Sequence, residues 1–167
     1  MIQKNFKEEA VIIEVEAQID KNNAIQARIC TSEDMESVFR LRHTVFVGEQ
    51  KVDEKIERDD LDKTATHALC LYDGEPVGTG RMYIQNGIAH LGRVCVLKEY
   101  RNKGLGRIIC TLLIEEAKRK RCDFVELSAQ LHAVPFYKKL GFTAEGDFFY
   151  EAGIQHVKML KRTAIIR

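Results

Sequence analysis

The feature that most constrains the fold of this chain is a strand, a glycine-containing turn and a helix in direct succession. Residues 88–97, "IAHLGRVCVL", are typical of a buried strand, and "RNKGLG" follows at 101–106. The next stretch has the spacing of an amphipathic helix, with a buried face formed by Leu105, Ile108, Ile109, Leu112, Leu113 and Ala117. A sheet with a helix packed on it is therefore expected.

The rest of the chain alternates between strand and helix patterns. Further strand patterns occur at 10–18, 25–31, 66–72, 77–84, 122–129 and twice within 142–160. Further helix patterns occur at 31–46 and 133–140. The turns at Asp73-Gly74 and Asn86-Gly87 join three of the strands into a meander. This order indicates an α+β or mixed-sheet architecture.

The charge balance argues against recruitment of a partner by a global electric field. The 167 residues carry 26 Lys and Arg against 25 Asp and Glu, so neither nucleic acid nor an anionic membrane is an expected partner. A basic run at 118–123, "KRKRCD", ends a helix, where cations complement the helix dipole. The length and a hydrophobic content of 45% predict one domain, alone or with an extension.

The cysteines and the N-terminus favour a reducing compartment. Five scattered cysteines form no CxxC pair and lie mostly among apolar neighbours, which argues against disulfides and zinc. No histidine pair has metal-ligand spacing, so no metal is expected. The first residues are too acidic for a signal peptide, and no segment approaches the length of a membrane span. The prediction is a cytoplasmic protein.

The turn at 101–106 has the chemistry of an anion site. A helix N-terminus carries unpaired N–H groups and a partial positive charge, and glycine lets a phosphate approach the backbone closely. Three cations, Arg101, Lys103 and Arg107, surround the same turn. A pyrophosphate or a similar dianion is the natural ligand, and a solvated turn with basic side chains is the alternative.

Two known phosphate-binding loops do not fit this turn. An ATP-type loop ends in Gly-Lys-Ser or Gly-Lys-Thr, which this chain lacks. The dinucleotide fingerprint is met by Gly104, Gly106 and the later Glu126, but Ile109 stands where the third glycine belongs. Residues 98–103 also separate the strand from the glycines, where that fingerprint needs them adjacent. A dinucleotide-binding domain is therefore not expected.

Two blocks of the sequence resemble one enzyme family. Residues 93–110, "RVCVLKEYRNKGLGRIIC", resemble the acyl-coenzyme-A signature of the GNAT N-acetyltransferases, a Gln/Arg-x-x-Gly-x-Gly/Ala pattern after a strand. Residues 133–142, "AVPFYKKLGF", are similar to the C-terminal helix of the same superfamily. The resemblance extends from Ile25 to Leu160, and "VFVGEQ", "ERDDLD" and "GIQHVKML" are similar to its branch of small single-domain bacterial proteins.

The resemblance implies a particular fold. It is a mixed, mostly antiparallel sheet of about six to seven strands with a splayed parallel strand pair, flanked by about four helices. Residues 25–167 would form the N-acetyltransferase domain. Residues 1–24 precede the resemblance and are an extension whose role is open: its strand pattern could add to this sheet or to that of a partner subunit.

The resemblance also implies a site for acetyl-coenzyme A. The pantetheine arm would pair with the main chain of the strand that ends near Val96, which splays from its parallel neighbour near Val125. The pyrophosphate would rest on the N–H groups of the glycine turn, beside the Arg101 side chain. The implied coenzyme-binding residues are Val94, Val96, Arg101, Asn102, Lys103, Gly104, Leu105, Gly106, Arg107, Gln130, Phe136 and Tyr137.

Acetyl transfer to an amine needs a base, a donor to the oxyanion and an acid for the leaving thiolate. The resemblance implies that Tyr137 is the acid, and a core tyrosine is the alternative. The N–H of Val96 is the expected oxyanion donor. The base stays open: His90 matches the position of a glutamate in the histone-acetylating branch. The other candidates are Glu49, Glu57, Asp60, Asp62, His67 and His156.

The segment from Glu49 to Asp62 carries seven acidic and three basic residues. It is either a solvated loop or the wall of an acceptor site that selects a cationic amine. In the family, the segment after the first helix borders the acceptor site. The resemblance therefore implies acceptor contacts from Glu57, Asp60, Asp62 and His67.

The function implied is an N-acetyltransferase. It would move the acetyl group of acetyl-CoA to a primary amine of a small molecule or a protein, by direct attack in a ternary complex. The alternative is a non-catalytic acetyl-CoA or CoA sensor, or a partner-binding module, in which Tyr137 would have no task. The expected assembly is a monomer or a homodimer.

Overall fold

The computed structural model describes residues 12–13 and 25–164. The strands are β1 (Ile12–Ile13), β2 (Ile25–Ile29), β3 (Thr66–Tyr72), β4 (Glu75–Gln85), β5 (Ile88–Val96), β6 (Phe124–Gln130), β7 (Thr143–Glu151) and β8 (Ile154–Arg162). The α-helices are α1 (Met35–Arg42), α2 (Glu54–Glu57), α3 (Leu105–Arg119) and α4 (Val134–Lys139). A π-helix, η2 (His43–Glu49), and four 3-10 turns complete the elements: η1 (Ser32–Asp34), η3 (Asp60–Lys63), η4 (Lys98–Tyr100) and η5 (Leu131–Ala133).

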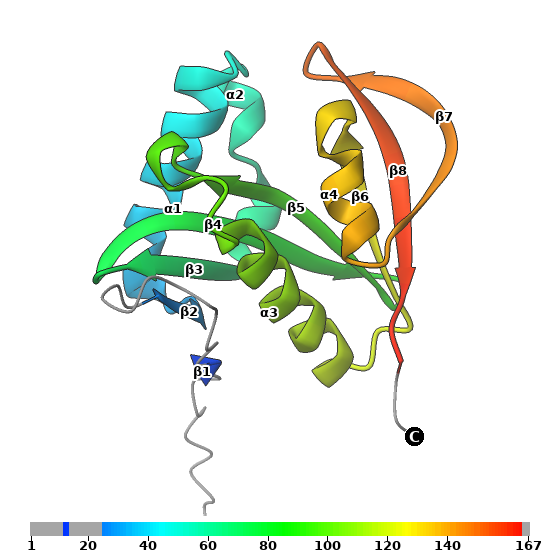
Figure 1. The fold of residues 1–167 in the computed structure, drawn as a ribbon, viewed down its shortest axis with the longest axis horizontal. Coiled ribbons are helices and arrows are strands. Elements are labelled where there is room, and N and C mark those ends of the chain that lie inside the picture. The colour runs from blue at the N-terminus through cyan, green and yellow to red at the C-terminus, as the bar shows by residue number, and fades with distance from the viewer. Residues whose placement is uncertain (1–11, 14–24, 165–167) are drawn as a thin grey trace, which may run out of the picture.

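The strands form one mixed sheet (Figure 1), in the order β1-β2-β3-β4-β5-β6-β8-β7. The pair β5–β6 is parallel, and every other neighbouring pair in the described part of the chain is antiparallel. Seven strands have five or more residues, and β1 adds two residues at the edge. The predicted fold class is confirmed. The rest of the predicted N-terminal strand lies outside the described residues.

The meander from β3 to β5 is built by the two predicted turns. Asp73 and Gly74 have φ angles of +50° and +84°, and Asn86 and Gly87 have φ angles of +52° and +75°. Two-residue hairpin turns need this left-handed backbone, which glycine and asparagine adopt at the lowest cost. The turn chemistry therefore sets the register in which the three strands pair.

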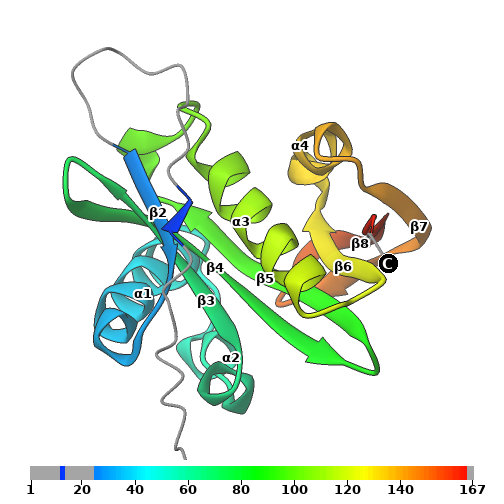
Figure 2. The same ribbon diagram turned by 90° about the horizontal axis from the view of Figure 1, so that it is seen from below.

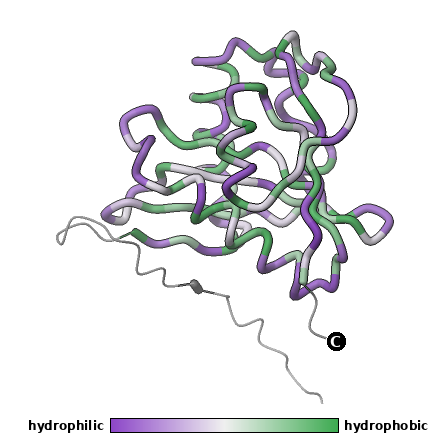
Figure 3. Tube along the Cα trace, turned by 45° about the vertical axis from the view of Figure 1, so that its right-hand side comes forward, coloured by the Kyte–Doolittle hydropathy of each residue, from purple (hydrophilic) through white to green (hydrophobic). Residues whose placement is uncertain are grey.

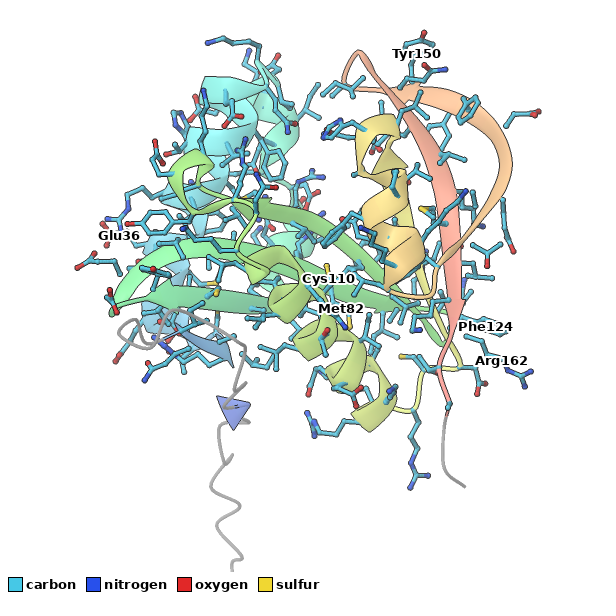
Figure 4. All side chains as sticks on the ribbon, in the orientation of Figure 1. Glu36, Met82, Cys110, Phe124, Tyr150 and Arg162 are labelled. Atoms are coloured by element: carbon cyan, nitrogen blue, oxygen red, sulfur yellow. The ribbon has the colours of Figure 1, made fainter. Side chains whose placement is uncertain are left out.

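The helices divide between the two faces of the sheet (Figure 2), with α1 and α2 on one face and α3 and α4 on the other. The helix α3 approaches β4 closely because residue 80 is a glycine: a Cβ there would lie 2.7 Å from Cγ2 of Ile109. Met82 and Cys110, labelled in Figure 4, are buried in the core between α3 and the sheet. In Figure 3 the hydrophobic stretches gather in the sheet and α3, while the outer turns are mostly hydrophilic.

The segment after β2 differs from the expected single helix over 31–46. It consists of η1, α1 and then η2, where the N–H of Gln50 donates to the carbonyl of Val45 at 2.9 Å. A π-helix of seven residues is too short to leave a distinct period in the sequence. The acidic stretch that follows contains α2 and η3.

Candidate active site

The strands β5 and β6 run side by side only at their beginnings. They pair over residues 88–91 of β5, whereas the strands continue to Val96 and Gln130. Beyond Leu91 the facing edges separate, and main-chain N–H and C=O groups of both strands line an opening in the sheet. An extended ligand with amide groups can pair with such an edge.

A β-bulge bends β5 where the separation begins. On β4, one residue lies between Thr79 and Arg81. On β5, two residues, Arg93 and Val94, lie between the partners of these two. Arg93 has a φ angle of +51°, and an extra residue of this kind bends the strand and increases its twist. The bulge explains why β5 leaves β6.

A cavity of about 960 Å³ opens at this separation. It is lined by the two separated edges, the start of α3, α4, the end of η2 and the β7–β8 turn. The predicted site residues in its lining are Glu57, His90, Val94, Val96, Arg101, Asn102, Gly104, Leu105, Gly106, Arg107, Gln130, Phe136, Tyr137 and His156. The predicted residues outside its lining are Glu49, Lys103, Asp60, Asp62 and His67.

The turn before α3 leaves the N-terminus of this helix open. Gly104 is the N-cap residue with a φ angle of +81°, and no side chain caps the helix. A Cβ at Gly104 would meet nothing within 4 Å. Gly106 packs against the ring of Phe136, which would lie 3.4 Å from a Cβ at that position. Free space at the first turn of a 15-residue helix fits an anion.

Arg101 is held by two partners beside this turn. Its Nε donates to the carbonyl of Val96 at 2.9 Å, and its two Nη atoms donate to the carboxylate of Glu49 at 2.6 and 2.7 Å. The hydrogen bonds from Arg101 lower the pKa of Glu49. In this structure Glu49 therefore binds the Arg101 guanidinium, which the sequence resemblance assigns to the pyrophosphate.

Tyr137 lies on α4 with its ring fixed by aromatic neighbours. It packs edge-on against Phe136 and Phe142, with centroid distances of 4.9 and 5.8 Å. Burial raises the pKa of the phenol well above its ordinary value, so the hydroxyl is protonated at neutral pH. No described residue hydrogen-bonds this hydroxyl, and Tyr137 lines the cavity. A protonated, unpaired hydroxyl can donate to a leaving group.

The N–H of Val96 points into the opening. The next N–H along the chain, that of Leu97, donates to the carbonyl of Val77 at 2.9 Å. Successive N–H groups of a strand point to opposite sides. The N–H of Val96 therefore points away from β4, toward the side where β6 has separated.

His90 lies on the paired part of β5. Its ring stacks on Tyr83, with centroids 4.7 Å apart. Its Nδ1 is 3.7 Å from Oε1 of Glu126, which is longer than a hydrogen bond. The Glu126 carboxylate is bound instead by Lys158 at 2.7 Å. The ring therefore has no fixed hydrogen-bond partner among these neighbours.

His156 lies on β8, where it pairs with the last residue of β6, Gln130. The side chain is buried, and its Nδ1 is 2.7 Å from the carbonyl oxygen of Ile154. One face of its ring stacks on Phe149, with centroids 5.9 Å apart. The ring is thus fixed in orientation where the cavity reaches β8.

Arginines neutralise the acidic segment. Arg42 binds Glu57 at 2.5 Å and Asp62 at 2.6 Å, and Arg81 binds Asp59 and Asp62 at 2.7 and 2.8 Å. Burial by itself raises the pKa of Asp62, but hydrogen bonds from Arg42 and Arg81 outweigh it and hold the pKa well below its usual range. These carboxylates are paired within the protein: the side chains of Glu57 and Asp62 are buried with the arginines, and that of Asp59 is partly exposed.

The other predicted acceptor residues lie elsewhere. Asp60 pairs with Lys63 in solvent, and Nε2 of His67 lies 3.1 Å from the carbonyl oxygen of Asp62. His67 and Asp62 line a second cavity of about 630 Å³. An acceptor contact by Asp60, Asp62 or His67 stays a prediction. All three residues lie outside the lining of the main cavity, which does not support such a contact.

Sequence reasoning missed a bridge between the two walls of the cavity. Nε2 of Gln130, at the end of β6, donates to Oε1 of Gln50 after η2, at 2.9 Å. Both residues line the cavity, as do Tyr83 and Glu126. A lone neutral amide after a π-helix belongs to no motif, so the sequence held no signal for Gln50.

Two expected absences concern metals and membranes. In residues 12–13 and 25–164, no group of three or more His, Cys, Asp and Glu side chains is placed to hold a metal ion. Within the same residues, no helix has the length and apolar character needed to cross a membrane.

The chain resembles known proteins over nearly all of its length. A family model described as "Acetyltransferase (GNAT) domain" matches residues 4–163. YyaT of Bacillus subtilis is 41% identical over 137 residues, which are 80% of this chain and 93% of that protein. YjcF of the same bacterium, which is named an N-acetyltransferase, is 41% identical over 131 residues, 77% of this chain and 93% of that protein.

Solved structures with the same fold include an acyl-CoA N-acyltransferase from Pseudomonas aeruginosa. Its TM-score is 0.72 at 28% identity, and the match covers 83% of this chain and 99% of that one. ElaA of Escherichia coli has a TM-score of 0.70 at 26% identity, with coverage of 83% and 99%. The fold, the family model and these relatives agree: the chain belongs to the GNAT acetyltransferase family.

Proposed function

We propose that the protein is an N-acetyltransferase that transfers the acetyl group of acetyl-CoA to a primary amine of a small molecule or a protein. The amine would attack directly, with both substrates bound at once. A single cavity that reaches both the glycine turn and the start of β8 supports a ternary complex of this kind.

The donor would bind along the separated edge of β5. Main-chain groups of Val94, and the carbonyl of Val96 once Arg101 turns away from it, would pair with the amides of the pantetheine arm. The open N-terminus of α3, with Gly104 at its cap, would hold the pyrophosphate. Arg101 would turn its guanidinium toward the pyrophosphate when Glu49 releases it. The free space around Gly104 supports this fit.

The reacting centre would lie between Val96 and Tyr137. When bound, acetyl-CoA supplies an activated thioester carbonyl. The N–H of Val96 would hold the negative charge that develops on the carbonyl oxygen, and one such donor contributes about 3 kcal/mol to the transition state. Tyr137 would give its proton to the leaving sulfur.

One observation carries this proposal. The protonated hydroxyl of Tyr137 has no hydrogen-bond partner among the described residues, and Tyr137 lines the same cavity as the open end of α3. A module that only binds coenzyme A needs the helix end but has no need of the phenol. This placement favours an enzyme over a sensor.

The test is a thiol-release assay with acetyl-CoA against a panel of polyamines, aminoglycosides, amino acids and peptides. We expect release that depends on at least one amine, with mass spectrometry showing one acetyl group on that amine. Calorimetry would measure acetyl-CoA binding in parallel. Binding without transfer to any amine of the panel would favour a sensor or partner-binding module instead.

A further inference from the structure

We propose that Nε2 of His156 is the general base of the transfer, an assignment that rests on the function proposed above. The base is the one catalytic group that the glycine turn and Tyr137 leave open. The geometry of β8 and of the β7–β8 hairpin points to this residue.

The tautomer of His156 follows from its contact with Ile154. A carbonyl oxygen can only accept a hydrogen bond, so the nitrogen 2.7 Å away, Nδ1, must carry a hydrogen and donate it. In the neutral ring, the lone pair that can take up a proton is then on Nε2. The main chain of β8 thus prepares one nitrogen of this ring as a base.

Nε2 of His156 is accessible. No described residue hydrogen-bonds it. The buried side-chain atoms that lack a partner in the described part of the chain are Nδ1 of His67 and Nε of Arg81. A buried Nε2 without a partner would belong to the same group, so Nε2 reaches free space. His156 lines the main cavity, and that space is therefore the cavity.

The position of His156 in the sheet suits the reaction. It pairs with Gln130 at the end of β6, beyond the point where β6 leaves β5. The helix α4, which carries Tyr137, follows only three residues later. Stacking on Phe149 and a side chain that is 8% exposed hold the ring in place. A fixed base and a fixed acid thus flank the same opening.

The competing acids are occupied. The Glu49 carboxylate is bound by Arg101, which lowers its pKa and weakens it as a base. Glu57 is bound by Arg42 and is 3% exposed, and Glu126 is bound by Lys158. The Glu57 and Glu126 carboxylates therefore already have cationic partners in the protein.

The competing histidines lack one of the required features. His90 lines the cavity, but no hydrogen bond to its Nδ1 fixes the tautomer, and the nearest carboxylate is 3.7 Å away. Nε2 of His67 is hydrogen-bonded to the carbonyl of Asp62, but His67 lies outside the main cavity. His132 also lines the cavity, in an exposed turn. Among these, His156 alone combines a fixed tautomer with a free nitrogen in the cavity.

The proposed step balances its protons. The amine nitrogen forms a bond to the carbonyl carbon, and the proton it loses goes to Nε2 of His156. The C–S bond then breaks, its electron pair stays on sulfur, and sulfur takes the proton of Tyr137. One proton passing through solvent from the imidazolium to the phenolate restores both groups.

The decisive variant is His156→Asn. The side-chain amide nitrogen of asparagine can take the place of Nδ1 and keep the bond to the Ile154 carbonyl, but it supplies no base. We expect turnover to fall by about a hundredfold, the range for loss of a general base. The acetyl-CoA dissociation constant should stay within about twofold. His43→Asn, at an exposed histidine of η2, is the matched control and should keep wild-type turnover.

A second variant separates chemistry from structure. His156→Ala leaves an imidazole-sized space that opens to the cavity, so added imidazole should restore part of the turnover of the folded variant and leave the wild type unchanged. Absence of rescue in folded His156→Ala would overturn the assignment. Wild-type turnover of His156→Asn, or a loss seen only with His90→Asn, would overturn it as well. If the wild-type protein transfers acetyl to no amine, the proposed function itself fails.

Discussion

The proposed acid step depends on one oxygen atom of Tyr137. Because the ring is fixed by Phe136 and Phe142 and no described residue bonds the hydroxyl, Tyr137→Phe should preserve the fold and the affinity for acetyl-CoA. Turnover should fall by at least about tenfold, since a general acid contributes at least that much. Thiol release and calorimetry measure the two effects. An unchanged turnover would remove Tyr137 from the mechanism.

Two variants at Gly104 test the anion site, because their side chains have nearly the same size and differ in charge. Asn and Asp have nearly the same shape, and both tolerate the left-handed backbone better than other side chains do. The space around residue 104 is open. Gly104→Asp should therefore abolish acetyl-CoA binding by placing an anion at the phosphate site, whereas Gly104→Asn should weaken it by less than about tenfold. Equal affinities of the two variants in calorimetry would mean that the ligand lies elsewhere.

Single residues also show where sequence reasoning ends. The glycine turn and Tyr137 belong to local motifs, so their place in the cavity could be predicted. The partner of His156 could not be predicted, because it is the main-chain carbonyl of Ile154, and no sequence pattern marks such a contact. Gln50 and Gln130 meet although 80 residues separate them, and no local pattern encodes such a contact.

Among the elements, η2 and the glycine turn are joined by the Glu49–Arg101 pair. Both side chains are partly exposed, and such pairs contribute up to about 1 kcal/mol. Glu49→Gln should free Arg101 and tighten acetyl-CoA binding by about two- to fivefold, because a pyrophosphate no longer competes with a carboxylate. Glu54→Gln removes a neighbouring exposed carboxylate and should change nothing. Weaker binding by Glu49→Gln would show that Glu49 positions Arg101 instead.

The elements that the sequence predicted well are those with local causes. The amphipathic helix α3 follows from its apolar spacing, and the hairpins follow from Asp73-Gly74 and Asn86-Gly87. The π-helix η2 and the bulge at Arg93 were not predicted. Both depend on how the chain packs against distant elements, and that information is not contained in a short window of sequence.

The stability of the whole molecule depends on the buried charge cluster around Asp62. This residue joins Arg42 of α1 to Arg81 of β4, so its loss leaves buried guanidinium groups without a full complement of partners. Asp62→Asn should lower the free energy of unfolding by about 3 kcal/mol at pH 7. Urea denaturation measures this loss. Asp60→Asn, in an exposed pair, should leave the midpoint unchanged.

The same cluster predicts the pH dependence of stability. The pKa of Asp62 is lower in the folded protein than in the unfolded chain, so its contribution is fully present above the unfolded pKa of about 4 and declines as the pH falls below it. The difference between the wild type and Asp62→Asn should therefore be constant from pH 7 to pH 5 and smaller at pH 3. A difference that grows on acidification would contradict this assignment.

The bulge at Arg93 has a consequence for the redesign of this sheet. Ala89 and Leu91 face the α3 core before the bulge, and Val94 and Val96 pack against the same core after it. Deleting Arg93 alone would keep all four side chains on that face, restore an unbroken ladder with β4 and remove the bend. A one-codon deletion would thus leave the hydrophobic pattern intact and still close the opening between β5 and β6, so this opening depends on one inserted residue.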